Sequence, residues 1–234
     1  MNQLTNLLEQ WNIELSDVSL NQFQKYYELL IEWNEKINLT AITEKEDVIV
    51  KHFLDSAALL SYMDLSEQSI IDIGTGAGFP GIVLKIMCPS CKVTLLDSLN
   101  KRIKFLNEVI DVLDLKNINA VHGRAEDFAH DKQYREKYDI VTSRAVANLS
   151  TLSEYCLPFA KVNGMFIPYK SGNIDEELSE SKKAISILGS SVEKVERFIL
   201  PNTDFERSLV FVNKNKATQK QYPRKSGIPS KNPL

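Results

Sequence analysis

A glycine-rich turn directly follows the first short apolar run of the chain, and it constrains the fold more than any other feature. The segment predicts a strand, a tight turn and the start of a helix, and it reads IIDIGTGAGFPG over residues 70–81. Glycine lets the backbone approach a ligand closely, and a proline suits the first helical turn, where its missing N–H would have no partner. The segment therefore predicts a ligand site at the carboxyl end of a buried strand.

The spacing of the glycines distinguishes two kinds of nucleotide-binding turn. A dinucleotide fingerprint reads GxGxxG, and its third glycine packs the helix closely against the strand. Phe79 occupies that third position here, and the spacing is GxGxG, preceded by Asp72. This pattern favours a methyltransferase, whose ligand ends in an amino acid, over a dehydrogenase. For the motif taken alone, a tight turn without a ligand is the alternative.

Short apolar runs separated by helical segments follow residue 66, which is typical of a parallel sheet with helical crossovers. We expect strands at 69–73, 92–96, 118–122, 138–142, 164–169, 193–199 and 208–213, and helices at 80–87, 101–113, 149–159 and 174–187. The predicted fold class is α/β: a Rossmann-like domain with a mixed seven-stranded sheet and helices on both faces.

The chain divides into three predicted regions. Residues 1–66 show helical spacing of apolar side chains and predict a helical lobe packed on the core, with Trp11, Phe23, Tyr27 and Trp33 inside it. Residues 67–213 form the Rossmann-like domain. Residues 214–234 contain lysines, arginines and prolines but no acidic residue, and we interpret them as a basic, flexible and solvated tail.

Composition excludes several classes of protein. The chain is 43% hydrophobic and 25% charged, which is ordinary for a globular protein, and no stretch has the apolar length of a membrane helix or a signal peptide. We therefore expect a cytoplasmic protein, a monomer, without membrane contacts.

Cys88 and Cys91 form a CxxC that we interpret as a helix-to-strand turn, with metal or redox use as the alternative. Because His52, His122 and His130 show no paired spacing with it, no metal is expected.

Polar residues follow three further predicted strands. Asp97 and Ser98 come after the second strand, where a carboxylate can accept both ribose hydroxyls of a nucleoside, although Asp97 alone could be a helix N-cap. Residues 123–127 follow the third strand, where backbone atoms around Ala125 and Glu126 are placed to contact an adenine edge. Residues 143–147 follow the fourth strand, at the expected mouth of the pocket. Carboxyl ends of parallel strands meet at one edge, so one joint site is expected.

These segments and others resemble the bacterial small-subunit ribosomal RNA guanine-N7 methyltransferases, a family also called glucose-inhibited division protein B. The matching blocks cover nearly the whole chain: WNEKINLT (33–40), HFLDS (52–56), DIGTGAGFPGI (72–82), LLDSLNKRIKFL (95–106), HGRAED (122–127), SRAVANL (143–149) and YPRKSGIPSKNPL (222–234). The last block departs from the family at Ser226 and Ile228, where proline and threonine are more common.

The resemblance implies the class I S-adenosylmethionine-dependent methyltransferase fold, with S-adenosyl-L-methionine as the methyl donor. It implies 16S ribosomal RNA or the 30S subunit as the partner, and a guanine of the 530 loop, guanosine 527, as the acceptor. The glycine turn and the family pattern together place the cofactor on Asp72, Gly74, Gly76, Gly78, Phe79, Asp97, Ser98, Ala125, Glu126 and Arg144.

No catalytic acid or base is expected, because N7 of guanine carries an available lone pair. The chain reads SRAV after the fourth strand, where enzymes that methylate amines carry NPPY or DPPY. Because the net charge is −3, any RNA contact must use local basic patches. We expect such contacts from Lys101, Arg102, Lys170, Arg207, Arg224 and Lys225, with Tyr169 and Tyr222 as stacking surfaces for a base; for each cation the alternative is a solvated surface charge.

Three alternatives stay open from the sequence. One is a methyltransferase of the same fold that acts on a small molecule, and another is a non-enzymic ribosome-binding factor with a vestigial nucleotide fold. The third concerns His52 and Asp55, one helical turn apart: we interpret them as a structural hydrogen bond between lobe and core, rather than a catalytic pair.

Overall fold

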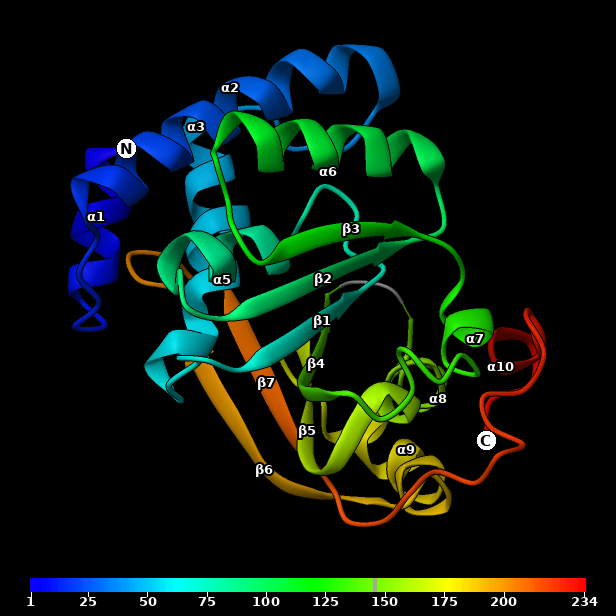
Figure 1. Ribbon diagram of the computed structural model, residues 1–234. Helices are drawn as coiled ribbons and strands as arrows, with labels where there is room; N and C mark the ends of the chain where they lie inside the picture. The colour runs from blue at the N-terminus through cyan, green and yellow to red at the C-terminus, as the bar shows by residue number, and fades with distance from the viewer. Residues whose placement is uncertain (145–146) are drawn as a thin grey trace.

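Seven strands form one sheet through the middle of the molecule, in the order β3-β2-β1-β4-β5-β7-β6 (Figure 1). The computed structural model describes residues 1–144 and 147–234. Strands β1 to β5 pair in parallel, and β7 runs antiparallel to both β5 and β6. The strands are β1 (Ser69–Ile73), β2 (Lys92–Asp97), β3 (Ile118–His122), β4 (Tyr138–Arg144), β5 (Ala160–Ser171), β6 (Ser190–Ile199) and β7 (Glu206–Lys214). The predicted mixed seven-stranded sheet is confirmed.

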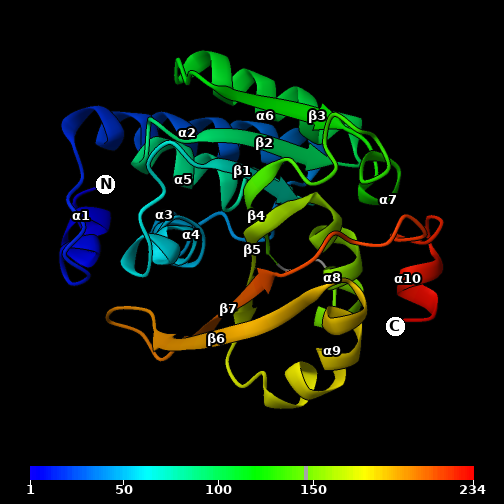
Figure 2. The ribbon, with the colours of Figure 1, turned by 60° about the horizontal axis from the view of Figure 1, so that its bottom comes forward.

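Helices cover both faces of this sheet (Figures 1 and 2). Ile70 and Ile71 are neighbours on β1, yet they belong to two different hydrophobic clusters, because successive side chains of a strand point to opposite faces. The cluster around Ile70 includes residues of α5 (Gly81–Met87) and α6 (Asn100–Val112). The cluster around Ile71 includes residues of α8 (Leu149–Cys156) and α9 (Asp175–Ile187).

The N-terminal lobe shares its core with the first of these faces. Its helices are α1 (Asn2–Glu9), α2 (Asp17–Ile37), α3 (Lys45–Val48) and α4 (Asp55–Ala57), with a π-helical turn at Ile49–Leu54 and a 3₁₀ turn at Ala58–Ser61. Phe53, at 0% exposure, packs on Phe23 and Tyr26 of α2 and on Phe79 of the glycine turn, with ring centroids 4.9, 5.4 and 6.1 Å away. The glycine turn therefore stands directly on the lobe.

The remaining aromatic residues expected in the lobe lie nearer its surface. Trp11, Tyr27 and Trp33 are only partly buried and pack against the same cluster, whereas Phe23 is fully buried. Trp33 contacts Phe105 of α6, with ring centroids 5.8 Å apart. In the two described ranges, no helix combines the length and the apolar character needed to cross a membrane.

The segment after β7 is held to the rest of the domain at several points, although most of its residues are exposed, as its composition indicated. It runs across the sheet's α7 (Ala125–Phe128) and α8 side and includes the short helix α10 (Ile228–Lys231) (Figure 1). Arg135 donates to the carbonyls of Thr218 and Tyr222 at 2.8 and 2.9 Å, and the buried ammonium of Lys214 donates to the carbonyl of Leu157 at 2.8 Å. Basic side chains thus bind main-chain carbonyls here, which composition alone does not reveal.

The division of the chain into three regions, with boundaries after residues 66 and 213, stays a prediction.

Candidate cofactor and substrate site

The glycine turn adopts a conformation that its sequence requires. Gly74, Gly76 and Gly78 have φ angles of +68°, +63° and +95°, in the left-handed region that side chains disfavour. A Cβ on Gly78 would also lie 2.5 Å from Cδ1 of Ile82. The N–H of Gly74 donates to the Leu96 carbonyl at 2.8 Å, which ties the turn to the end of β2.

Gly81 takes over the packing role of the third glycine in a dinucleotide fingerprint. A Cβ at this position would meet Cδ2 of Leu95 at 2.3 Å, so only glycine lets α5 approach β2 so closely. Its N–H donates to Oδ2 of Asp72 at 2.9 Å, and Thr75 Oγ1 donates to the same oxygen at 2.7 Å. Burial raises the pKa of Asp72 to about 6. Asp72 therefore supports the turn from its buried side, through hydrogen bonds with Thr75 and Gly81.

Two cavities lie above the turn, at the carboxyl ends of the parallel strands. The larger, of about 370 Å³, is lined by Leu39, Thr40, His52, Gly74, Thr75, Gly76, Ala77, Phe79, Asp97, Ser98, Arg102 and Arg144. The smaller, of about 170 Å³, is lined by Ile73, Gly74, Leu96, Asp97, Ser98, Gly123, Arg124, Ala125, Glu126 and Tyr155. They share Gly74, Asp97 and Ser98, so together they offer an elongated site across the ends of β1, β2 and β3.

Most residues predicted to bind the cofactor meet in these cavities. Gly74, Gly76, Phe79, Asp97, Ser98 and Arg144 line the larger one, and Ala125 and Glu126 line the smaller one. Asp72 and Gly78 line neither, since they shape the turn from its buried side. Ala145 and Val146 of the predicted pocket mouth lie outside the described residues.

Asp97 ends β2 with its carboxylate only 2% exposed and already hydrogen-bonded. Its Oδ2 accepts from the Gly76 N–H at 2.9 Å and from Arg102 Nη1 at 3.1 Å, and its Oδ1 accepts from the Leu99 N–H at 2.9 Å. A carboxylate has about four acceptor sites, so one remains for a ligand hydroxyl while Arg102 stays in place. Arg102, predicted to contact RNA, lines the larger of the two cavities.

Arg144, at the end of β4, forms the most connected group of the site. Its Nη1 donates to Oδ2 of Asp55 and to the Lys51 carbonyl, both at 3.1 Å. Its Nη2 lies 3.1 Å from Nδ1 of His52, and its guanidinium carbon lies 5.0 Å from the centre of the Phe79 ring. One side chain thus joins the sheet, the glycine turn and the helical lobe.

The network fixes the protonation of His52. Because a guanidinium only donates, Nδ1 must accept from Arg144, and the proton sits on Nε2, which donates to Thr40 Oγ1 at 2.9 Å. Burial, and then the nearby Arg144 charge, lower the pKa of His52 to about 3. The predicted structural role of His52 and Asp55 matches this geometry, but both residues bind Arg144 and neither binds the other within the described residues.

A third cavity lies on the other side of Arg144. Its volume is about 410 Å³, and it is lined by Lys51, His52, Asp55, Arg144, Tyr169, Lys170, Ser171, Glu177 and Arg207. Lys170 donates to Oε1 of Glu177 at 2.6 Å, and Arg207 Nε donates to Oδ1 of Asp55 at 3.0 Å. Since His52 and Arg144 also line the larger cofactor cavity, this third cavity adjoins it.

The structure does not bring the six predicted RNA-binding residues together. Only Lys170 and Arg207 line the third cavity. Lys101 donates to the Ile37 carbonyl of the lobe at 3.1 Å, and Arg224 pairs with Glu154, which is 0% exposed. Lys225 lies on the C-terminal segment with an exposed side chain. Whether these cations contact RNA stays a prediction.

Tyr169, expected to offer a stacking surface for a base, is largely buried and lies in the wall of the third cavity, so its stacking role stays a prediction. Tyr169 is 5% exposed, and its hydroxyl donates to the Ser56 carbonyl at 2.8 Å, so β5 uses this ring to bind the lobe. Tyr222 is partly buried against the cluster under α8 and α9.

Sequence reasoning missed several residues that line the cavities, among them Arg124, Leu39, Tyr155 and Glu177. Arg124 lies within a segment that already pointed to adenine, and Leu39 lies in the first matching block, so each had a usable signal. Tyr155 and Glu177 belong to helices α8 and α9 and carry no motif, because only the folded chain brings those helices to the strand ends.

The CxxC forms the predicted helix-to-strand turn. Cys88 follows α5 and Cys91 precedes β2, with the Cys91 N–H donating to the Cys88 carbonyl at 3.2 Å. Burial raises the pKa of the Cys91 thiol to about 12, which disfavours the thiolate that binds metals. In residues 1–144 and 147–234, no three His, Cys, Asp or Glu side chains cluster as metal ligands would.

The strand order and the cavities at the carboxyl edge define a methyltransferase-type α/β domain. The fold is similar to a SAM-dependent methyltransferase from Aquifex aeolicus, with a TM-score of 0.53 and 18% identity over 72% of this chain and 93% of that chain. It is also similar to TYW2 of M. jannaschii in complex with AdoMet, with a TM-score of 0.55 and 13% identity over 69% and 76%.

Sequence comparison identifies the family. The family model described as rRNA small subunit methyltransferase G matches residues 19–209. Curated relatives of that name include proteins of Lachnoclostridium phytofermentans, 55% identical over 97% of this chain and 94% of the relative, and Desulforamulus reducens, 54% identical over 100% of both. The chain belongs to the rRNA small subunit methyltransferase G family.

The neutral state of His52 predicts a pH-dependent stability. The unfolded histidine takes up a proton near its ordinary pKa of 6.5, whereas the folded one does so only near 3. Between these values the unfolded state binds more protons, so the free energy of unfolding falls as the pH falls, by up to about 1.4 kcal/mol per pH unit. Urea unfolding at pH 7, 6 and 5 should show this loss in the wild type and a shallower one in His52→Gln.

The exposed His122 supplies the matched control, since His122→Gln should keep the wild-type pH dependence. Parallel curves for the wild type and His52→Gln would contradict the assignment of a neutral, buried His52.

Proposed function

We propose that this chain transfers a methyl group from S-adenosyl-L-methionine to N7 of a guanine in the 530 loop of 16S ribosomal RNA, guanosine 527. Membership of the rRNA small subunit methyltransferase G family supports the reaction class and the RNA substrate. The observation that carries the finer assignment is the third cavity, which adjoins the cofactor cavity through Arg144 and carries groups complementary to guanine. An intact cofactor site favours an enzyme over a non-enzymic ribosome-binding factor.

The described residues fit S-adenosylmethionine. Asp97 keeps an acceptor site for a ribose hydroxyl, and it gains a second if Arg102 turns away from Oδ2. Ala125 and Glu126 would hold the adenine end, and the N–H groups and open backbone of the glycine turn suit the amino-acid end. When bound, the cofactor supplies an activated methyl group on its sulfonium.

The third cavity offers both kinds of partner that a guanine base needs. Guanine presents O6 as an acceptor and N2–H as a donor, and N7 must stay free for methylation. Lys170, Arg144 and Arg207 supply cationic donors for O6. Glu177 uses Oε1 to accept from Lys170 and from the Leu149 N–H, and within the described chain its Oε2 accepts no hydrogen bond. We infer that Oε2 accepts from the N1–H and N2–H edge of guanine.

Catalysis by positioning suits this site. With the cofactor bound, the N7 lone pair would take the methyl group while the sulfur–methyl bond breaks and its electron pair returns to sulfur, leaving a neutral thioether. The base loses no proton, so no general base would be required. His52 is unsuited to that role, because its Nδ1 is occupied by Arg144 and its Nε2 carries the proton. Aligning the nucleophile with the methyl group supplies several kcal/mol, up to about 7 to 11 in the best intramolecular reactions.

Purified protein, labelled S-adenosylmethionine and 30S subunits or 16S RNA from a strain lacking the gene should yield one methyl group per RNA. Reduction and aniline treatment, which cleave RNA at N7-methylguanosine, should then break the chain at position 527 of the 530 loop. Label in another nucleotide, or on another atom of that guanine, would refute the finer assignment and leave the family membership standing.

Glu177→Gln tests the guanine contact with little change in shape. An amide keeps one oxygen for Lys170 and Leu149 but presents N–H donors to the donor edge of guanine. Since well-placed base contacts are worth about 1 to 3 kcal/mol, kcat/KM for 30S subunits should fall roughly 5- to 150-fold, while the Kd of S-adenosylmethionine stays unchanged. The control Glu180→Gln, on the exposed face of the same helix, should behave as wild type. Equal kinetics of the two variants would contradict the contact.

A further inference from the structure

The end of the chain contacts residues that line the smaller cavity. Two side chains that line this cavity are held by residues of the segment 222–234, which we call the tail. Arg124 Nη1 donates to Ser226 Oγ at 2.8 Å, and the Gly227 N–H donates to Glu126 Oε1 at 3.2 Å. The positions of these wall residues therefore depend on where the tail lies.

A buried ion pair fixes the tail. Glu154 of α8 is 0% exposed, and its carboxylate is bound by Arg224 in a two-pronged arrangement, with Nη2 to Oε2 at 2.6 Å and Nε to Oε1 at 2.9 Å. The Arg224 N–H also donates to Oε1, at 2.7 Å. A carboxylate buried without such partners would be costly, so the pair holds the chain at Arg224 in one place.

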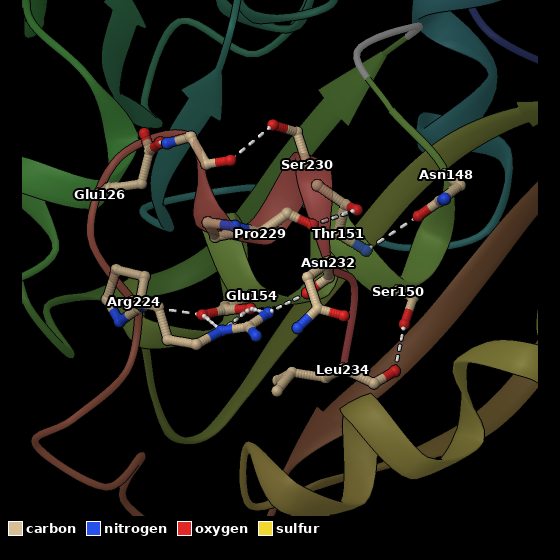
Figure 3. A network of polar contacts seen from close by, with 12 residues as sticks. Glu126, Asn148, Ser150, Thr151, Glu154, Arg224, Pro229, Ser230, Asn232 and Leu234 are labelled. Atoms are coloured by element: carbon tan, nitrogen blue, oxygen red, sulfur yellow. Dashed lines mark hydrogen bonds and ion pairs between the residues drawn. The ribbon is translucent and has the colours of Figure 1, made fainter.

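The same helix holds the tail at two further points, which Figure 3 shows together with the ion pair. Thr151 Oγ1 donates to the Pro229 carbonyl at 3.1 Å, and Ser150 Oγ donates to the Leu234 carbonyl at 3.1 Å. Arg224 Nη2 closes the tail on itself by donating to the Asn232 carbonyl at 2.8 Å. Glu154 anchors the tail while its neighbour Tyr155 faces the cavity, so one short stretch of α8 connects the two.

We propose that Glu154 and Arg224 are positioning residues for the cofactor: their ion pair seats the tail as the outer wall of the adenosine end of the site. The proposal rests on the proposed function in one respect, that this cavity binds S-adenosylmethionine. Tail docking and cofactor binding then strengthen each other, and the factor by which docking raises cofactor affinity equals the factor by which the cofactor stabilises docking.

Calorimetry with S-adenosylmethionine measures the effect directly. The Kd of Arg224→Gln should rise roughly 5- to 150-fold, the range typical of coupling between two sites. The Kd of Arg224→Lys, which keeps the charge, should rise less. Methylthioadenosine, which lacks the amino-acid end, should lose affinity by the same factor, because the tail touches only the adenosine end. At saturating cofactor, kcat should stay near the wild-type value, whereas KM for S-adenosylmethionine should rise with Kd.

Two controls separate positioning from loss of the fold. Lys220→Ala removes an exposed cation that precedes the segment 222–234, and this variant should bind the cofactor as the wild type does. The double variant Glu154→Gln/Arg224→Gln leaves no unpaired charge, and it is assayed at a temperature at which circular dichroism shows it folded. In the wild type, hydrogen exchange at the amides of Gly227 and Ile228 should slow when S-adenosylmethionine is added.

Each outcome of these measurements either supports or refutes the coupling between the tail and the cofactor. If the wild type binds S-adenosylmethionine and the folded Arg224 variants and double variant bind it within twofold as tightly, or if the tail amides exchange at the same rate with and without it, the coupling is refuted and the proposed function stands. If the wild type itself does not bind S-adenosylmethionine, the proposed function fails, and the coupling fails with it.

Discussion

The guanidinium of Arg144 is the group on which the arrangement of the site depends. It is held at the end of β4 by Asp55, by the Lys51 carbonyl and by the neutral ring of His52, and it lies over Phe79. Those four partners come from the helical lobe and from the glycine turn, which also meet through apolar packing and through the Tyr26 hydroxyl, which donates to the Ala77 carbonyl. Arg144 also lines both the larger of the two cavities above the glycine turn and the third cavity, so it lies between them.

The parallel sheet explains why these parts meet. Strands β1 to β4 end at one edge, where their backbones diverge and leave room for ligands. At that edge the glycine turn and Asp97 line the larger cavity, and the segment after β3 lines the smaller one. Leu39, Thr40 and His52 of the lobe also line the larger cavity, and the tail holds Arg124 and Glu126 in the wall of the smaller one.

Much of the fold was predictable because local pattern and global structure agree. The apolar run at residues 69–73 became a strand with those bounds, since a parallel strand buried on both faces needs such a run. The run at 118–122 also has its predicted bounds, although it lies at the edge of the sheet and is only partly buried. Strand β5 instead begins at Ala160, four residues before its predicted start. The stretch Lys161, Val162, Asn163 is largely exposed, and Asn163 has a φ of +69°, so the apolar pattern that marks a buried strand begins only after it.

The site was less predictable wherever the partner lay far away in sequence. Asp97 and Gly76 were identifiable from motifs, but the hydrogen bond of Tyr169 to the Ser56 carbonyl and the pairing of Arg224 with Glu154 depend on the folded chain. By composition, both residues looked like free surfaces for RNA. In the structure, each donates to an acceptor on a buried residue, and a list of basic and aromatic residues does not show that this acceptor exists.

The single-turnover methylation rate of Arg144→Lys tests the central claim most directly. Lysine keeps the positive charge but lacks the planar fork that binds Asp55 and His52 together. With saturating S-adenosylmethionine and 30S subunits, the rate should fall on the order of 100-fold, while Arg197→Lys, at an exposed ion pair on β6, should leave it unchanged. A folded Arg144→Lys that methylates within threefold of the wild-type rate would contradict the account.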